Sequence, residues 1–251
     1  MRSLTIRTVT SAPAMLLPLI LAAMMATGCA GRLKTAGPEP EVSEAIISNA
    51  VSGPVKISEL KGFGEITMVK SGQKLSGKFD ALRKNSGTFN AQVYSPFGSA
   101  VASITANDFK GRADINREQF DFTFDDTMEG IPFPCAKYFT YESFAKVLTA
   151  SMPNEFWALP AAPDTLIHSK KRSKKGHKMV TAAWVSDTLT IRALLVPKTG
   201  LLESVAFNYA VDGKKLTMQF GRFKRGVPYE ILVRENSKNY ISVNYETITW
   251  K

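Results

Sequence analysis

The 251-residue sequence lacks most of the chemistry that enzymes use. It has only two histidines, His168 and His177, and only two cysteines, Cys29 and Cys135. It contains no Gly-x-Ser-x-Gly nucleophile turn, no His-Glu-x-x-His zinc motif, no glycine-rich phosphate loop, and no His and Cys cluster at metal-ligand spacing. We therefore expect a protein that is not an enzyme and that binds no metal and no other cofactor.

Long apolar runs are also scarce, and the clearest one lies at the N-terminus. It extends over residues 12–27, follows Arg2 and Arg7, and ends in small residues. A basic start, a short apolar stretch and small residues at the end are typical of a secretory signal, and the run is short for a membrane span. Residues 1–28 are therefore predicted to be a signal peptide.

The end of this run, Ala26-Thr27-Gly28-Cys29, resembles the bacterial lipobox, although Ala26 stands where leucine is usual. The resemblance implies that the Cys29 thiol is diacylated and that the chain is cut before it. The new N-terminus then receives a further acyl chain. Ala30, rather than aspartate, follows the cysteine, which in this family favours sorting to the outer membrane. The alternative is an ordinary secretory signal with an incidental cysteine.

The sequence has no excess of acidic residues to oppose its lysines and arginines. The formal net charge is +10, and removal of Arg2 and Arg7 with the signal leaves +8. A basic body suits anionic lipid headgroups or an acidic partner, and nucleic acid is not expected outside the cytoplasm. Lipidation of Cys29 leaves Cys135 without a disulfide partner, and a domain of about 190 residues can fold without one. Cys135 is expected to be buried.

Residues 29–56 have the composition of a polar tether, with prolines and the apolar spacing of one short helix over 41–51. Beyond it, over 57–251, apolar and polar residues alternate in many short segments, which predicts antiparallel strands with one apolar face. The alternating apolar positions are Leu75 to Ala81, Phe89 to Val93, Phe120 to Phe124, Ile191 to Leu195, Val205 to Tyr209, Leu216 to Phe220, Ile231 to Val233 and Ile241 to Tyr245. Glycine-containing turns over 70–73, 197–200 and 211–214 join neighbouring strands.

One segment, from about Tyr138 to Leu159, interrupts the strand pattern. Phe139, Phe144 and Leu148 lie on one face of a predicted helix, and a second short helix is expected over 153–159 before Pro160. These helices either fill the concave face of the sheet as core or cover a cavity as a lid. The fold class is thus mainly β: a large curved antiparallel sheet forming a half-open barrel, with a short helical insertion in mid-chain.

Several short motifs, in their order along the sequence, resemble those of the LolB-like lipoprotein receptors of the LolA/LolB fold family. They are Lys61-Gly62-Phe63-Gly64-Glu65-Ile66, Val93-Tyr94-Ser95-Pro96-Phe97-Gly98-Ser99, the helix pair, and Ile248-Thr249-Trp250-Lys251. The resemblance implies a monomeric, non-enzymatic outer-membrane lipoprotein whose body faces the periplasm. Such a receptor takes acylated lipoproteins from a LolA-type carrier into an apolar cavity and inserts them into the outer membrane.

The resemblance also implies roles for particular residues. Phe97 lies on the turn formed with Ser95, Pro96 and Gly98. It matches the position of an apolar residue that enters the membrane in this family, a position at which leucine is common. Burial of such a side chain is worth about 1.5–3 kcal/mol. Acyl chains are expected on the concave face, for which the candidate residues are Phe79, Phe89, Val93, Phe122, Leu195, Phe207 and Met218. The alternative for each is plain core.

A dense basic run lies over 168–178 and includes Lys170, Lys171, Arg172, Lys174 and Lys175. A run of like charge usually forms a solvated loop, which is the first interpretation. As a docking loop it would contact an anionic bilayer or attract an acidic carrier. Two other functions stay open: a lipid-binding or stress-sensing lipoprotein of the same fold without transfer activity, and a structural envelope lipoprotein.

Overall fold

A computed structural model describes residues 58–115, 117–151, 162–173, 176–211 and 213–251. All of them belong to one compact unit, Pro40–Lys251. Several predictions concern residues outside the described ones. These are the predicted signal peptide, Cys29, the predicted tether and its short helix, the second predicted helix over 153–159, and Lys174 and Lys175.

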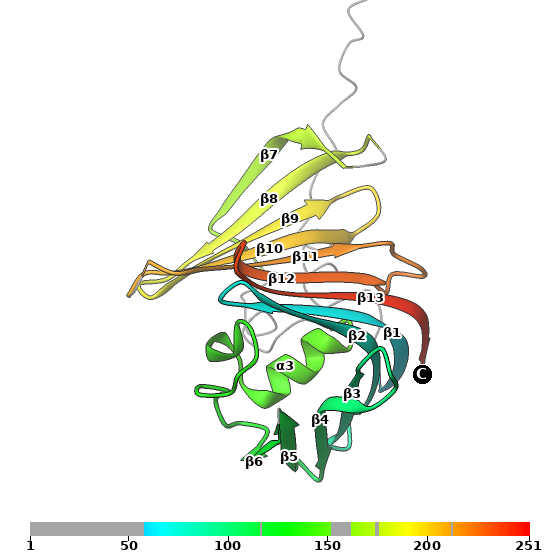
Figure 1. The fold of residues 1–251 in the computed structure, drawn as a ribbon. Helices are drawn as coiled ribbons and strands as arrows, with labels where there is room; N and C mark the ends of the chain where they lie inside the picture. Colours follow the sequence, from blue (N-terminus) through cyan, green and yellow to red (C-terminus); the bar gives the residue numbers. More distant parts are fainter. Residues whose placement is uncertain (1–57, 116, 152–161, 174–175, 212) are drawn as a thin grey trace, which may run out of the picture. The chain divides into compact units, whose positions relative to one another are not determined.

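The described residues form one open antiparallel sheet of 13 strands (Figure 1). Its strands are β1 (Glu59–Lys70), β2 (Gln73–Lys84), β3 (Thr88–Tyr94), β4 (Ala100–Asn107), β5 (Lys110–Ile115), β6 (Glu118–Thr123), β7 (Thr165–Arg172), β8 (Lys178–Val185), β9 (Leu189–Val196), β10 (Leu201–Tyr209), β11 (Lys215–Gly221), β12 (Glu230–Asn236) and β13 (Asn239–Trp250). The order is β6-β5-β4-β3-β2-β1-β13-β12-β11-β10-β9-β8-β7, so the first and last strands pair at the centre. The predicted fold class is confirmed.

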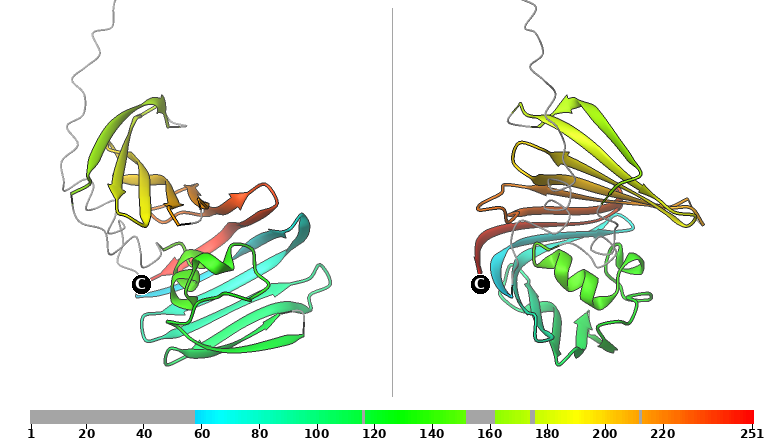
Figure 2. Two further views of the ribbon diagram at one scale, coloured as in Figure 1. Left: turned by 90° about the vertical axis from the view of Figure 1, so that its left-hand side faces the viewer. Right: turned by 180° about the vertical axis from the view of Figure 1, so that it is seen from behind.

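The sheet has one apolar face, which we call the inner face because the helix α3 (Tyr141–Leu148) packs on it (Figure 2). The register continues this face from strand to strand: Ile66 pairs with Val243, and Val243 pairs with Ile231. Since side chains alternate along a strand, every second residue joins the same apolar layer. The opposite face, here the outer face, carries most of the polar side chains of the strands.

At the centre of the sheet, the packing depends on a glycine. Tyr245 is fully buried on β13, and a Cβ atom built on Gly62 would lie 2.3 Å from its ring. Gly64 adjoins the register shift between Phe63 and Gly64, where its Cβ would meet the Asn244 backbone. The glycines of the Lys61–Ile66 segment thus let β13 approach β1 closely.

The insertion between β6 and β7 contains a 3-10 turn, η1 (Ala136–Tyr138), and α3. Thr140 caps α3 by accepting a hydrogen bond from the Ser143 amide at 3.2 Å. The helix is amphipathic, and Phe144, Val147 and Leu148 are buried as the spacing predicted. It ends at Leu148, with Thr149 as its C-cap, so it occupies the first part of the predicted helical segment.

The prediction that the basic run forms a loop is wrong for its first half. His168 pairs with Val180 and Ser169 with Met179, so Lys170, Lys171 and Arg172 lie in β7 rather than in a loop. The turn follows, where the Ser173 amide donates to the His177 carbonyl at 2.9 Å. Pairing with the apolar strand β8 determines the strand, and this partner cannot be recognised from the charges of β7 alone.

Candidate functional site

Helix α3 closes the inner face over the first half of the sheet. Phe144 and Leu148 line, together with residues of β1 to β4 and Phe133, a cavity of only about 10 Å³. Such a volume accommodates roughly one water molecule. Phe122 on β6 stacks on Tyr141 of α3 with the ring centres 3.6 Å apart. The apolar layer beneath α3 is therefore filled, and space for a ligand requires α3 to move.

The C-terminal end of α3 is held by a buried arginine. Arg83 of β2 donates from Nε to the Thr149 hydroxyl at 2.9 Å, from Nη2 to the Ser151 hydroxyl at 3.2 Å, and from Nη1 to Asn85 Oδ1 at 3.1 Å. Burial lowers the pKa of the Arg83 guanidinium, and the charge of Glu142 opposes this shift. A buried cation that meets neutral acceptors is held less firmly than one in an ion pair.

Tyr245 provides a second attachment at the same end. Its hydroxyl donates to the carbonyl of Leu148, the last residue of α3. Burial raises the pKa of this phenol, so the group stays neutral. Because Tyr245 belongs to β13 and Arg83 to β2, one end of α3 is attached to two strands on either side of β1.

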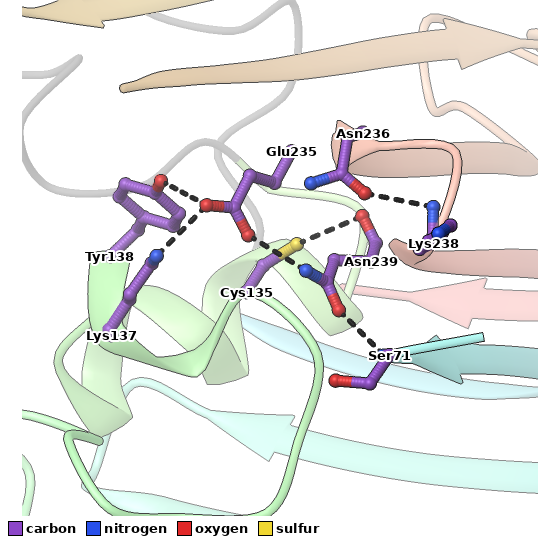
Figure 3. Close-up of polar contacts among 8 residues, drawn as sticks. All are labelled: Ser71, Cys135, Lys137, Tyr138, Glu235, Asn236, Lys238 and Asn239. Atoms are coloured by element: carbon purple, nitrogen blue, oxygen red, sulfur yellow. Dashed lines mark hydrogen bonds and ion pairs between the residues drawn. The ribbon is translucent and has the colours of Figure 1, made fainter. Parts of the chain in front are cut away.

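The η1 side of the insertion is attached through Glu235 of β12 (Figure 3). Glu235 Oε1 accepts from Lys137 Nζ and from the Tyr138 hydroxyl, each at 2.9 Å, and Oε2 accepts from Asn239 at 3.3 Å. Burial alone raises the pKa of Glu235, but the contacts with Lys137, Tyr138 and Asn239 outweigh it, and the pKa is lowered. The segment of the insertion from η1 to α3 is thus fastened by polar contacts at both of its ends.

Cys135 lies beside this network and is buried, as expected from the sequence. Its thiol is 3.7 Å from the carbonyl oxygen of Asn239. Burial raises the pKa of the Cys135 thiol to about 11, so the group is protonated at neutral pH and is a poor nucleophile.

The turn between β3 and β4 presents Phe97 to solvent. The Phe97 side chain is 97% exposed. The turn beneath it is well defined: the Ser95 amide donates to the Ser99 carbonyl at 2.8 Å, and the Gly98 amide donates to the Ser95 carbonyl at 2.9 Å. Gly98 has φ of 84°, a conformation that favours glycine. An exposed phenylalanine is therefore held on a fixed turn, away from the sheet.

The residues predicted to line an acyl-binding cavity all lie in the layer of the inner face and are buried. They are Phe79, Phe89, Val93, Phe122, Leu195, Phe207 and Met218. The alternation therefore identified the buried face of the sheet. Phe79 and Val93 lie under α3, whereas Leu195, Phe207 and Met218 belong to the strands β9 to β11.

A larger cavity, of about 760 Å³, lies on the outer face of β9 to β13, and sequence reasoning missed it. Leu194, Leu232 and Phe223 contribute apolar surface, and Arg222 forms an ion pair with Glu230 at 3.1 Å. The available signal was two leucines at polar positions of the alternation. None of the seven predicted acyl-binding residues lines this cavity.

Two classes of site are absent from the described ranges. They contain no group of three or more His, Cys, Asp or Glu residues that could hold a metal ion. Among the same residues, no helix combines the length and the apolar character needed to cross a bilayer.

No protein-family model and no curated protein matches this sequence. Solved structures do resemble it in fold. A domain described as an outer membrane lipoprotein-sorting protein, from Vibrio parahaemolyticus, aligns with a TM-score of 0.50 and 8% identity over 83% of this chain and 92% of its own. A DUF1329 family protein from Desulfovibrio piger aligns with a TM-score of 0.53 and 9% identity over 83% and 92%. A LolA superfamily protein from Nitrosomonas europaea aligns with a TM-score of 0.49 and 8% identity, over 84% of this chain and 94% of its own.

At 8% and 9% identity these likenesses concern the fold. The chain is similar in fold to these proteins, and its own described residues form an open antiparallel sheet with an apolar inner face and a short helical insertion.

Proposed function

We propose that this protein is a lipid-anchored lipoprotein of the outer membrane that accepts acylated lipoproteins from a periplasmic carrier and delivers them to the membrane. It acts without catalysis and without a cofactor, as a monomer whose body faces the periplasm. The observation that carries the proposal is the continuous apolar inner face, covered by a short insertion that polar contacts hold at both ends.

Acyl chains need such a surface. Each buried methylene is worth about 0.8 kcal/mol, so a triacylated protein does not cross water unaided. The inner face supplies apolar area once α3 moves away. The contacts at its ends are hydrogen bonds that Arg83 and Tyr245 donate to the insertion and that Glu235 accepts from it. Water can replace such bonds at modest net cost, whereas the apolar layer needs another apolar partner.

In the delivery step, Phe97 orients the protein relative to the membrane. It is the most exposed of the large apolar side chains described, and its turn has little freedom. Transfer of this side chain into lipid, at about 1.5–3 kcal/mol, is enough to orient the body and too little to anchor it. Anchoring is the role of Cys29.

The test is a transfer assay with the full lipidated chain in liposomes and a carrier loaded with a labelled acylated lipoprotein. Wild type is expected to strip the carrier and pass the cargo into the bilayer. Phe97→Glu is expected to accept cargo, recovered bound to the protein, and to deliver it at least about tenfold more slowly, the effect of about 1.4 kcal/mol. Val211→Glu is the matched control, because Val211 is 86% exposed on another turn.

A receptor that takes no cargo from the carrier would overturn the proposal. The alternative is then a lipid-binding or stress-sensing lipoprotein of the same fold. The filled layer beneath α3 and the separate outer cavity of about 760 Å³ favour that alternative, because a small ligand could bind there without any movement of α3.

A further inference from the structure

The outer cavity is the space of about 760 Å³ on the outer face of β9 to β13. Its floor is one row of residues that the register places side by side across these five strands: Leu194, Ser204, Gln219, Leu232 and Ser242. None of them belongs to the apolar core of the inner face. The sheet itself therefore separates a ligand on this floor from anything that binds on the inner face.

Three turns at one end of the sheet form a wall of the cavity (Figure 1). They join β7 to β8, β9 to β10 and β11 to β12, and they contribute Ser173, His177, Thr199, Phe223 and Gly226 to the lining. The volume lies within the range of sites for small molecules, roughly 300–1,000 Å³. The cavity is thus large enough for a small molecule with both an apolar and a polar part.

Aliphatic side chains line the cavity along β9 and β10. Val196 pairs with Leu201 at the ends of these strands, and Leu194 is the next residue of β9 on the same face. Phe223, from the turn between β11 and β12, adds an aromatic ring. The outer face of an antiparallel sheet is usually polar, so these side chains gain stability from an apolar partner such as an acyl chain.

The same lining holds a guanidinium that still has a donor group to offer. Arg222 forms an ion pair with Glu230 at 3.1 Å, and its Nη2 donates to the Tyr245 carbonyl at 2.6 Å. Its Nη1 has no partner among the described residues. Arg222 also has φ of 46°, a strained conformation for a residue other than glycine, and such strain is common at binding sites.

Glu203 is the remaining charged residue of the described lining. It lies at the register shift between Leu202 and Ser204, and it makes no hydrogen bond or ion pair within the described part of the chain. Besides His177, the described lining therefore has one cation and two carboxylates. A purely anionic ligand would meet an excess of carboxylate, and a purely cationic one would leave Arg222 Nη1 unpaired. A ligand that carries both charges matches both groups.

We propose that the outer cavity binds a zwitterionic single-chain lipid, namely a lysophospholipid whose headgroup carries an amine. Arg222 binds the phosphate, Glu203 binds the ammonium group, and the acyl chain lies along Leu194, Val196 and Leu201. This binding does not rest on lipoprotein transfer, because it uses the opposite face of the sheet and requires no movement of α3.

The experiment uses the full lipidated chain in liposomes and two photoactivatable probes with the same acyl chain, lysophosphatidylethanolamine and lysophosphatidylglycerol. Labelling is measured over a range of probe concentrations, and the labelled residues are identified by mass spectrometry. The zwitterionic probe is expected to label the lining of the outer cavity with at least about tenfold higher apparent affinity than the anionic probe. The chain is basic, which by itself favours the anionic probe, so the opposite preference reports on the site.

A competitor tests the contribution of the acyl chain. Glycerophosphoethanolamine has the same headgroup but no chain, and displacement of the zwitterionic probe is expected to require at least about tenfold more of it than of unlabelled lysophosphatidylethanolamine. Equal competition would show that the headgroup alone is the ligand and would overturn the proposal. Both this test and the comparison of probes use the unaltered protein, so neither depends on the folding of a variant.

Three variants locate the site. Glu203→Gln is expected to weaken labelling by the zwitterionic probe at least about tenfold and labelling by the anionic probe less than about twofold. Ser204→Phe fills the floor of the cavity and is expected to abolish labelling there. Thr217→Phe is its matched control, because Thr217 lies on the outer face two residues before Gln219 and is not among the described lining residues. Labelling should be unchanged in this variant.

Equal labelling by the two probes would overturn the proposal. So would labelling that Ser204→Phe leaves intact, or labels that fall on inner-face residues such as Leu195 instead of Leu194. Loss of cargo transfer with labelling of the outer cavity intact would count against the proposed function alone. Loss of this labelling with transfer intact would count against the lipid site alone.

Discussion

Gly62 leaves the space that the Tyr245 ring occupies, and through that ring it supports the end of α3. A methyl group at this position would force the ring to shift. Gly62→Ala is therefore expected to lower the free energy of unfolding by about 1–3 kcal/mol, as overpacking of a core does. Urea denaturation measures this change. In a Tyr245→Leu background, Gly62→Ala should lower the free energy of unfolding by clearly less. An equal loss in both backgrounds would show that a clash with the Tyr245 ring is not the cause.

Glu235 gives the insertion a pH-dependent attachment. Its pKa is lowered in the folded protein, so the carboxylate contributes stability that is present above the pKa of the unfolded chain and is lost as the pH falls through the folded pKa. Glu235→Gln is expected to reduce the free energy of unfolding by about 1 kcal/mol at pH 7. The difference from wild type should shrink as the pH falls below about 4, the ordinary range for Glu.

The control for this prediction is Glu65→Gln, which removes an exposed carboxylate 3.1 Å from Lys78. Exposed pairs contribute little, so this variant should stay within about 0.5 kcal/mol of wild type at both pH values. A stability difference for Glu235→Gln that does not change with pH would show that the charge of Glu235 is not the cause.

At the scale of the element, α3 depends on Thr149 more than on its own surface charges. Thr149→Val keeps the shape of the side chain but removes the acceptor of Arg83 Nε, leaving a buried cation short of one partner. The expected cost is about 1–3 kcal/mol. In hydrogen exchange, the amides of Phe144 to Leu148 should exchange faster in the variant than in wild type. The amides of β2 should keep their protection. If α3 and β2 lose protection together, the insertion is not an independently opening unit.

Lys146→Ala is the matched control on the same helix. It breaks the 2.9 Å ion pair of Lys146 with Glu142, two partly buried side chains one turn apart on α3. Such a pair on a helix surface is worth about 0.3–0.5 kcal/mol. Exchange in α3 should therefore change little in this variant.

The elements also differ in how far the sequence determines them. Strands with large apolar residues at alternate positions, such as β3, β9 and β11, could be predicted, because Phe89 or Met218 marks the inner face directly. β5 offers mainly small or charged residues, and β7 is half basic; both become strands through pairing with their neighbours. The face on which the acyl candidates lie was predictable. The filling of its part beneath α3 was not, because it depends on how α3 packs against several strands.

At the scale of the whole molecule, the first and last strands meet at the centre of the sheet. β1 pairs with β13, and the backbone amide of Ser58 donates to the Lys251 carbonyl at 2.8 Å. The two halves of the chain therefore share one hydrogen-bonded sheet. Alternation within single segments predicted the strands and their turns, whereas this long-range pairing has no local signal and was not predicted.

In the proposed function, the protein contacts the membrane through its basic body and one apolar tip, Phe97. The contributions of the charge and of the tip to membrane binding respond differently to salt. Without the predicted signal peptide, the chain has a formal charge of +8, from +10 less Arg2 and Arg7. With Cys29→Ser, which removes the proposed site of the acyl anchor, it is expected to bind anionic vesicles better than neutral ones. This preference should largely disappear between about 0.05 M and about 0.5 M salt, because the screening length falls below 10 Å. Phe97→Glu should weaken binding at both salt concentrations, since apolar transfer is not screened. Vesicle flotation measures both effects. Binding that ignores salt but depends on Phe97 would assign membrane contact to the tip alone, and binding that ignores Phe97 would remove the tip from the delivery step.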